Sequence, residues 1–316
     1  MSMGTDIKYG EEKAKEAKIF INKLYNASKF VIQNVKVIEV RDIASLKLQE
    51  KDKWILSELD RLIKAVNKNI DKYALGVATS NLIEFTVSKF CDWYIELSKV
   101  DLYGNDNERK VATQNVLLYA FSTLLKVFHP FIPFVTEYIY QELPNHQETI
   151  MYCDFPKKVE VKGLNNHFEH IIEIIRSIRN ARAEFNVPDN RRTNIYLMVE
   201  KKNKMIEENL EEIAKLGFGT KCEIVKSEPE EKCTKVICGD VKVFLPMGQL
   251  VDNAKEKERL EKEIEKLNFE VNRSEKMLAN AGFVAKAPKA LVDGEKEKLE
   301  NNKNLLKKMQ KELSEL

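Results

Sequence analysis

The sequence predicts a mostly α-helical protein, made of a helical bundle, a small α/β domain and an antiparallel coiled-coil hairpin. Three observations predict this fold class. Long amphipathic segments fill the first half of the chain, short β-rich runs appear only after it, and heptad-spaced apolar residues mark the C-terminal end. A chain of 316 residues is long enough for two or three domains. We place them at residues 1–155, 156–251 and 252–316.

The first domain is expected to be an antiparallel bundle of long helices with short connections. We expect these helices at 11–35, 50–73, 74–100 and 108–128. The first begins with two acidic residues, and Thr5 or Asp6 can cap its N-terminal side. The second carries its apolar residues on one stripe, formed by Trp54, Leu56, Leu59, Leu62, Ile63 and Val66.

The segment "HPFIPFVTEYIY" follows the last of these helices and contains two prolines three residues apart. Each proline removes a backbone donor and clashes with the preceding turn, so a helix does not continue through both. We expect Pro130 to end one helix and Pro133 to sit in the first turn of the next. Phe131 and Phe134 are expected to pack the joint, and His129 is interpreted as structural rather than catalytic.

The second domain begins with one more helix, at 165–187, which Pro188 stops. Short β-rich runs then follow, with one helix among them at 202–216 that ends at Gly217. The runs lie at 194–200, 221–227, 234–239 and 241–247. This alternation predicts a small α/β unit.

The third domain carries two heptad runs around a segment with a glycine and a proline, "NAGFVAKAP", which predicts an antiparallel coiled-coil hairpin. The first run is Leu260, Ile264, Leu267, Val271, Ser274, Leu278 and Ala281. The second run is Val292, Glu295, Leu299, Asn302, Leu306, Met309, Leu313 and Leu316. Each arm of about 25 residues would project roughly 40 Å. Because such a rod buries only a narrow seam, it is expected to dock onto a partner and to hold no catalytic pocket.

Composition excludes several classes of function. The net charge of +2 excludes a uniformly basic nucleic-acid binder but allows local basic strips. We find no apolar run of transmembrane length and no signal peptide, so we expect a cytoplasmic protein without a membrane partner. The five cysteines lack zinc-site spacing, and His167 and His170 lack a third ligand, so no metal is expected. No phosphate-binding glycine loop and no nucleophile motif occurs, so we assign no catalytic residue and no cofactor to this chain.

Basic residues with interleaved amides form one strip on the first helix. At helical spacing the strip consists of Lys15, Lys18, Asn22, Asn26 and Lys29. The opposite side consists of Phe20, Leu24, Ala27 and Val31. A cationic strip with amide donors can follow a phosphate backbone and contact exposed bases. An ordinary solvated helix face explains the same pattern, and both interpretations stay open.

Two further basic groups are candidates for RNA contacts. The helix at 165–187 carries Arg176, Arg179 and Arg182 at three-residue spacing. These arginines either contact RNA or brace two domains through ion pairs. The hairpin tip carries Lys276, Lys286 and Lys289, with no acidic residue between them. A basic tip on a long rod suits a contact with a nucleic-acid backbone.

Two motifs make a family resemblance specific. "NKLYNASKFV" resembles N-K-[LI]-W-N-A-x-R-F, from the anticodon-binding domain of the class I synthetases for valine, isoleucine and leucine. Here Tyr25 replaces the usual tryptophan and Lys29 the usual arginine, which keeps the charge but loses the planar fork. "HPFIPFVTEYIY" is similar to the family's H-P-F-x-P-F-x-T-E-E-[IL]-[WY], with Tyr138 in place of the second glutamate.

The C-terminal region selects among these relatives. Its turn resembles N-x-x-F-V-x-K-A-P of the coiled coil in the valyl-tRNA synthetase family, and "IIRSIRNARAEFNVP" and "FLPMGQLVD" are similar to that family's linking region. The family's H-I-G-H-type and K-M-S-K-S-type catalytic motifs do not occur. The resemblance therefore implies a C-terminal fragment that begins after the catalytic domain. We expect it not to activate valine by itself, whereas the full-length enzyme uses ATP.

The resemblance implies a mechanism with two RNA contacts. The bundle would receive the anticodon stem-loop of valine tRNA, and the hairpin would reach the outer corner where the D and T loops meet. Each contact raises the effective concentration for the other. We expect a monomer. Two rival interpretations remain: a stand-alone tRNA-binding protein that acts in trans, and a coiled-coil scaffold protein.

Overall fold

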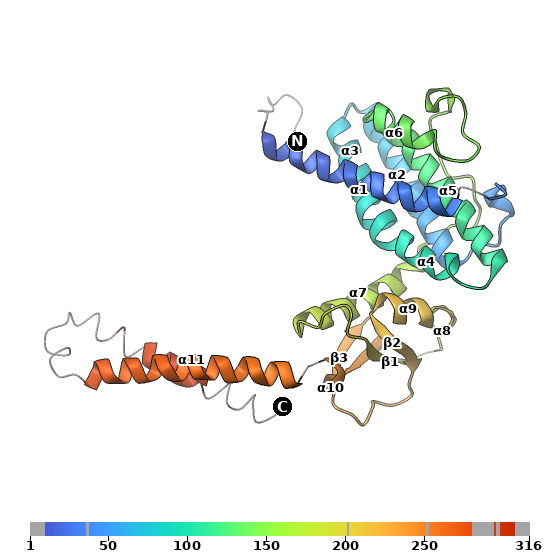
Figure 1. Ribbon diagram of the computed structural model, residues 1–316. Helices are drawn as coiled ribbons and strands as arrows, with labels where there is room; N and C mark the ends of the chain where they lie inside the picture. The colour runs from blue at the N-terminus through green and yellow to red at the C-terminus, as the bar shows by residue number, and fades with distance from the viewer. Residues whose placement is uncertain are drawn as a thin grey trace. The chain divides into compact units, whose positions relative to one another are not determined.

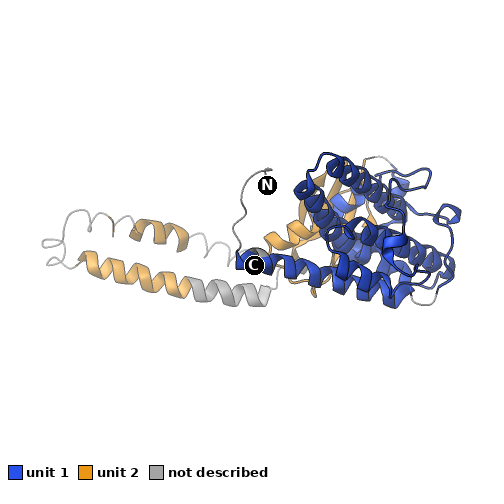
Figure 2. Cartoon of the chain, turned by 90° about the horizontal axis from the view of Figure 1, so that it is seen from above, with its two compact units in different colours: residues 1–176, 201–217 blue, residues 177–200, 218–316 orange. Residues whose placement is uncertain are grey.

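The structure is a computed structural model that describes residues 10–35, 38–200, 202–250, 253–279, 294 and 298–306. The chain divides into two compact units (Figure 2). Unit 1 comprises residues 1–176 and 201–217, and unit 2 comprises residues 177–200 and 218–316. The boundaries set from the sequence, at 155 and 251, divide the chain differently and stay a prediction. Each unit is described by itself below.

Unit 1 is built mainly of helices (Figure 1). Its principal helices are α1 (Glu11–Val35), α2 (Glu50–Asp71), α3 (Leu75–Glu84), α4 (Ile95–Leu102), α5 (Asn107–Phe128) and α6 (Pro133–Tyr140). Two short 3-10 helices also occur, η1 (Ile43–Ser45) and η3 (Ile150–Tyr152). The predicted first helix has the bounds of α1. Its expected caps, Thr5 and Asp6, lie outside the described residues.

Helix α5 forms the centre of the bundle, since it contacts α1, α2, α4 and α6. All six residues of the predicted apolar stripe on α2 are buried, as predicted from their spacing. Each large apolar side chain removed from water contributes about 1.5–3 kcal/mol. This shared interior holds the outer helices, α1 among them, in fixed orientations.

By length and composition, α5 is also long and apolar enough to cross a membrane. The sequence-based statement that no such run exists is therefore wrong. Within the bundle, however, 72% of this apolar window is buried. Burial against other helices accounts for the apolar composition.

The predicted helix at 74–100 is interrupted in its middle by a π-helical segment, η2 (Phe85–Tyr94), between α3 and α4. A π-helical segment changes which side chains face inward after it. Here it ends on Tyr94, which is fully buried.

The two prolines form the expected corner. Helix α5 ends with His129 as its C-cap, and Pro133 opens α6. His129 Nδ1 lies 2.9 Å from the Thr136 hydroxyl, so the ring joins the two helices as the structural interpretation requires. The expectation for Phe134 is wrong, because its side chain is exposed rather than packed in the joint.

The segment after the bundle begins with α7 (Glu169–Glu184), whose residues fall in both units. Two short helices, α8 (Lys204–Glu208) and α9 (Leu210–Leu216), replace the single helix predicted at 202–216. Asn209 separates them with a non-helical backbone, at φ −121° and ψ 23°. Both belong to unit 1, where α9 contacts α4.

Unit 2 contains a four-stranded mixed sheet in the order β2-β1-β4-β3. The strands are β1 (Thr193–Val199), β2 (Gly219–Ile224), β3 (Cys233–Cys238) and β4 (Val241–Pro246), with the short helix α10 (Met247–Leu250) after them. Strands β1 and β2 are parallel, whereas β4 is antiparallel to both β1 and β3. All four predicted strands are confirmed. The alternating burial of β1 shows that one face of the sheet packs inward.

The C-terminal part of unit 2 contains α11 (Asn253–Ala279) and a described helical stretch at 298–306. Within residues 264–279 of α11, where burial is described, Val271 and Ser274 are buried, and both belong to the predicted heptad run. Within 298–306, the half-buried positions are Leu299, Asn302 and Leu306, which also follow the predicted heptad. Lys303 pairs with Glu275 at 2.6 Å, which brings the two predicted arms side by side.

Candidate nucleic-acid interface

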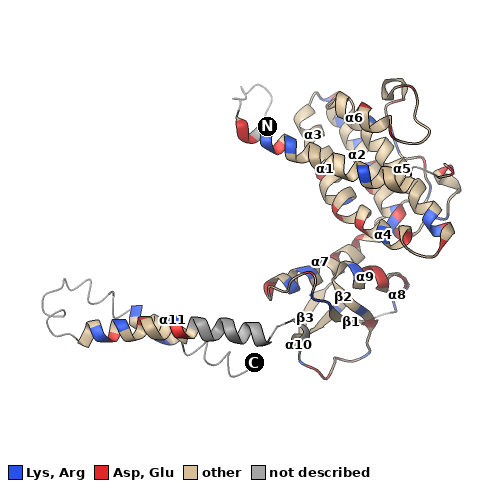
Figure 3. Ribbon diagram, viewed as in Figure 1, with Lys and Arg blue, Asp and Glu red and all other residues tan. Residues whose placement is uncertain are grey.

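The five residues of the cationic strip on α1 are all exposed. The side expected to face the core contains Leu24, Ala27 and Val31, which are buried, and Phe20, whose ring packs 5.6 Å from that of Phe128. No neighbouring helix among the described residues covers the strip. Glu11 and Glu12 lie in the first turn of α1, and Glu16 is an exposed acid beside the strip; no acidic residue of α1 follows it (Figure 3). The strip therefore offers a continuous cationic surface to a polyanion.

Aromatic side chains adjoin this strip. The Lys29 ammonium lies 4.6 Å from the centre of the Tyr25 ring. The Tyr25 ring in turn lies 6.4 Å from the Tyr138 ring of α6. From the sequence, both tyrosines were identified only as departures from the family motifs. Their proximity depends on how α6 packs on α1, which the local pattern does not specify.

The three arginines of α7 lie in different environments. Arg176 is exposed, and its guanidinium carbon lies 5.8 Å from the Trp93 ring centre. Arg179 is half-buried, with its guanidinium carbon 5.3 Å from the Phe218 ring centre. Arg182 is only 2% exposed. Regular spacing along the helix therefore does not give them a common surface.

The two terminal guanidinium nitrogens of Arg182 donate hydrogen bonds inside unit 2. Its Nη2 donates to the carbonyl oxygens of Pro188 at 3.2 Å and Arg191 at 2.6 Å, and its Nη1 donates to Thr193 Oγ1 at 3.0 Å. Burial lowers the pKa of Arg182; the Asp189 carboxylate opposes this, and the nearby Arg192 and Arg191 lower the pKa further. These bonds tie the end of α7 to the start of β1. The partners of Arg182 in these bonds are backbone and hydroxyl oxygens of unit 2, so the bracing of two domains through ion pairs stays a prediction.

Of the three lysines predicted at the hairpin tip, Lys276 is described and is exposed near the end of α11. Lys286 and Lys289 lie outside the described residues. Their assignment to a nucleic-acid contact stays a prediction.

Metal-binding and thiol chemistry have little support in the described part of the chain. It contains no group of three His, Cys, Asp or Glu residues arranged to hold a metal ion. All five cysteines are free and half-buried. Burial raises the pKa of Cys91 to about 11 and that of Cys222 to about 12, which keeps both thiols protonated at neutral pH.

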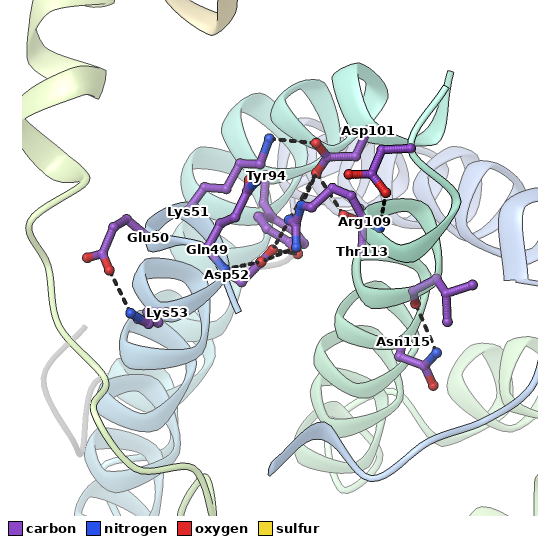
Figure 4. Close-up of polar contacts among 12 residues, drawn as sticks. Gln49, Glu50, Lys51, Asp52, Lys53, Tyr94, Asp101, Arg109, Thr113 and Asn115 are labelled. Atoms are coloured by element: carbon purple, nitrogen blue, oxygen red, sulfur yellow. Dashed lines mark hydrogen bonds and ion pairs between the residues drawn. The ribbon is translucent and has the colours of Figure 1, made fainter. Parts of the chain in front are cut away.

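A buried cluster of charges, which the sequence analysis did not identify, joins helices of unit 1 (Figure 4). Arg109 on α5 forms a two-pronged ion pair with Asp52 on α2, at 2.7 and 2.8 Å. Its Nη2 also lies 2.9 Å from Asp101 on α4. Although burial by itself would lower it, these two carboxylates raise the pKa of Arg109. Arg109 therefore joins three helices as a permanent cation.

Lys51 forms the second half of the buried charge cluster. Its ammonium donates to Asp101 at 3.0 Å and to Glu212 of α9 at 2.8 Å. Tyr94 and Thr113 add hydrogen bonds to Asp52 and Asp101, at 2.9 and 2.7 Å. The cluster therefore has two cations, three carboxylates and few unused acceptors, as a buried polar network requires. A sequence signal exists, because Lys51 and Asp52 lie beside the apolar stripe of α2.

Comparison with known proteins gives two family matches. Residues 52–197 match the anticodon-binding domain of tRNA ligases. Residues 252–316 match the tRNA-binding arm of valyl-tRNA synthetase. The chain belongs to the valyl-tRNA synthetase family, as its C-terminal part. It thus carries the anticodon-binding domain and the tRNA-binding arm of a valine–tRNA ligase. The first match begins after α1, so the role of the cationic strip is not covered by it.

Individual relatives agree with this assignment. The chain is 37% identical to the valine–tRNA ligase of Clostridium acetobutylicum, over 99% of this chain and 36% of that relative. It is 38% identical to the valine–tRNA ligase of Carboxydothermus hydrogenoformans, over 94% of this chain and 34% of that relative. It is 39% identical to the valine–tRNA ligase of Clostridium perfringens, over 96% of this chain and 35% of that relative. The chain therefore spans about a third of the length of the valyl-tRNA synthetases it matches.

Proposed function

We propose that this chain binds valine tRNA at two separate places. The bundle, through the cationic strip on α1, takes the anticodon stem-loop. The hairpin takes the outer corner of the tRNA, where the D and T loops meet. Two contacts on one RNA strengthen each other, because the first raises the effective concentration for the second.

The exposure of the whole cationic strip is the observation that supports this proposal. Three lysines and two asparagines face solvent together on α1, while the opposite face of the same helix is buried. Lysines supply charge for phosphates, and asparagine amides can donate to and accept from bases. Arg176 and Arg179 are weaker candidates for additional RNA contacts, because each guanidinium group already lies beside an aromatic ring. Arg176 lies beside Trp93 in unit 1, and Arg179 lies beside Phe218 in unit 2.

This chain would be about a third of the whole protein. We propose that the whole protein attaches valine to its tRNA, uses ATP for this reaction and works in the cytoplasm. The resemblance stated from the sequence and the names of the relatives support this activity. The chain itself is proposed to be a monomer that serves the missing catalytic part by positioning the tRNA. It needs no cofactor for that task.

The test is a salt titration of tRNA binding. Lys15→Glu, Lys18→Glu and Lys29→Glu together should weaken binding and flatten the dependence of log affinity on log salt, by roughly one unit for each phosphate that is no longer neutralised. A matched control reverses Lys47, Lys68 and Lys72, three exposed lysines elsewhere on unit 1. The control should leave the slope nearly unchanged.

Two results would contradict the proposal. Equal losses from the strip and the control would mean that the strip is an ordinary solvated face. An absence of any salt-dependent RNA binding by the parent chain would instead favour the scaffold interpretation. Comparing valine tRNA with isoleucine tRNA in the same assay tests the preference for valine tRNA.

A further inference from the structure

Phe134 is the most exposed of the large apolar side chains noted in the described residues, at 92%. It lies in the first turn of α6, where the sequence predicted that it would pack the joint. One turn further on, Tyr138 is 60% exposed. Residues four apart lie on the same face of a helix. Helix α6 therefore presents two aromatic rings side by side to solvent, where they contribute nothing to the core.

These rings adjoin the cationic strip. Lys18, Asn22, Tyr25 and Lys29 follow one another along α1 at steps of four, three and four residues, so Tyr25 lies within the row of strip residues. The Tyr138 ring is tilted by 40° against the Tyr25 ring, with 6.4 Å between their centres. The adjacent Tyr25 hydroxyl, through its phenolate form and through a hydrogen bond, raises the pKa of Tyr138, which agrees with this close approach. Phe134, Tyr138 and Tyr25 thus form an aromatic patch beside Lys29.

The surroundings of the aromatic patch favour a nucleic acid over an apolar protein partner. The patch adjoins the cationic strip, because the Lys29 ammonium lies over the Tyr25 ring and the exposed amides Asn22 and Asn26 flank Tyr25 along α1. Two acids lie near these rings. Glu137 accepts hydrogen bonds from Gln141, Thr149 and the Ile150 backbone, so it is directed at its own loop, whereas Glu142 is exposed one turn after Tyr138 and helps to raise the pKa of Tyr138. Exposed aromatic rings beside basic side chains are the combination on which unpaired bases stack.

We propose that Phe134, Tyr138 and Tyr25 form a stacking platform for an unpaired nucleobase of an RNA loop, with Lys29 placed to contact the adjoining phosphate. The proposal rests on the proposed function, since it assumes that RNA lies along α1. It goes further by naming the single-stranded part of the RNA as the ligand of α6. Stacking tolerates any base, so the platform holds the loop open rather than reading its sequence.

The test uses two RNA probes, a short hairpin with an unpaired loop and a fully paired duplex of the same stem. Phe134→Leu and Tyr138→Leu keep an apolar side chain but remove the ring. Each should weaken hairpin binding by about 5- to 100-fold, the range measured when a stacking ring is removed. Phe134→Trp, which keeps a ring, should bind the hairpin as the parent does. Tyr103→Leu is the matched control, because Tyr103 is a 67% exposed tyrosine at the end of α4.

The salt dependence separates stacking from phosphate contact. The leucine variants should keep the slope of the parent, since no phosphate contact is removed, whereas Lys29→Gln should reduce it by roughly one unit. Binding of the duplex should be unchanged in the leucine variants. A fluorescent purine analogue in the loop should be quenched by the parent and recover its emission with Phe134→Leu and Tyr138→Leu.

Each contrary outcome has a distinct meaning. If the parent binds neither probe, the proposed function fails and the platform fails with it. If the parent binds the hairpin and the leucine variants bind it equally well, the platform is overturned while the proposed function stands. If those variants keep RNA binding but abolish self-association in sedimentation, the patch is a protein-docking surface and the proposal is wrong. Because Phe134 is almost fully exposed, its replacement should leave thermal unfolding unchanged, so a failure to fold does not confuse these outcomes.

Discussion

The Lys51 ammonium donates to Glu212 at 2.8 Å, although 161 residues separate the two in the sequence. Both side chains are almost completely buried, Lys51 at 1% exposure. Glu212 lies on α9, and this ion pair is therefore a principal tie between the 201–217 segment and the helices of unit 1. Removing these charged groups from water costs free energy, and only their ion-pair partners offset that cost. The loss of one partner therefore leaves an uncompensated buried charge.

Lys51→Met should destabilise the chain by about 3–5 kcal/mol, because it leaves Asp101 and Glu212 buried without this cation. Urea unfolding monitored by circular dichroism measures the loss. Lys53→Met is the matched control, since Lys53 pairs with Glu50 one turn away and its side chain is 30% exposed. The control should cost less than about 1 kcal/mol. Similar losses for both variants would show that the buried charge cluster contributes no more than a surface pair.

The same pair can be tested by a double-mutant cycle. Lys51→Met combined with Glu212→Gln should lose less stability than the sum of the two single variants, because each single change strands the other residue. A strictly additive double variant would mean that Lys51 stabilises the fold through Asp101 alone.

Tyr94 predicts a loss of stability at alkaline pH. Burial, and next the neighbouring Asp52 carboxylate, raise the pKa of Tyr94 well above its usual value of 10.0. Because the pKa of Tyr94 is raised in the folded state, the contribution of Tyr94 to the free energy of unfolding is complete below pH 10.0. That contribution decreases as the pH rises toward the folded-state pKa. The free energy of unfolding should therefore fall above that pH.

Tyr94→Phe should make this alkaline decline shallower and should cost about 1.5–3 kcal/mol at neutral pH, because the hydrogen bond to a charged acceptor is lost. Urea unfolding measured across the alkaline range provides the comparison. Tyr103→Phe, which changes an exposed tyrosine, should keep the decline of the parent. An identical decline in Tyr94→Phe and the parent would contradict the assignment to Tyr94.

Local periodicity was sufficient to predict most of the fold. The apolar stripe of α2, the four strands and the heptad positions around Val271 all depend on spacing within one element, and all are confirmed where the structure describes them. The split between α8 and α9 was missed because a helical pattern continues through Asn209, whose backbone leaves the helix.

The buried charge cluster and the aromatic patch could not be predicted in the same way. Whether Lys51 is buried depends on α9, and α9 is distant in sequence. Whether Phe134 packs the corner or faces water depends on the angle between α5 and α6. In the candidate site, the exposure of the strip followed from helical periodicity, whereas its aromatic neighbours required the tertiary structure.

Arg182→Leu should destabilise unit 2 by roughly 1–3 kcal/mol, because it removes the donors that satisfy the Pro188 and Arg191 carbonyl groups. Hydrogen exchange of the β1 amides should increase with the variant. Arg176→Leu, at an exposed position of the same helix, should leave that exchange unchanged. Reduced tRNA affinity in Arg182→Leu without faster exchange would argue for a direct RNA contact.

Reversing Lys276, Lys286 and Lys289 together should weaken the binding of full valine tRNA but not that of an isolated anticodon stem-loop. A stem-loop is too short to reach both proposed contacts, since a helical arm spans about 1.5 Å per residue. Filter binding with both RNAs measures the difference. Equal losses for the two RNAs would refute the two-contact proposal.

Removing residues 252–316 should leave the bundle folded, because the heptad positions of the hairpin pair with one another. The shortened chain should retain the cooperative melting of the helices in unit 1, measured by circular dichroism. Loss of that transition would show that the hairpin is needed for the bundle to fold.

Unit 1 is discontinuous in the sequence, and this has a consequence for how such a gene can be recombined. A crossover that transferred only the codons for 1–176 would deliver Lys51 and Asp101 without Glu212. The recipient would have to supply an acid at the matching place on its own α9, or accept a buried lysine with one partner fewer. The bundle is therefore inherited intact only when the codons for 201–217 travel with it.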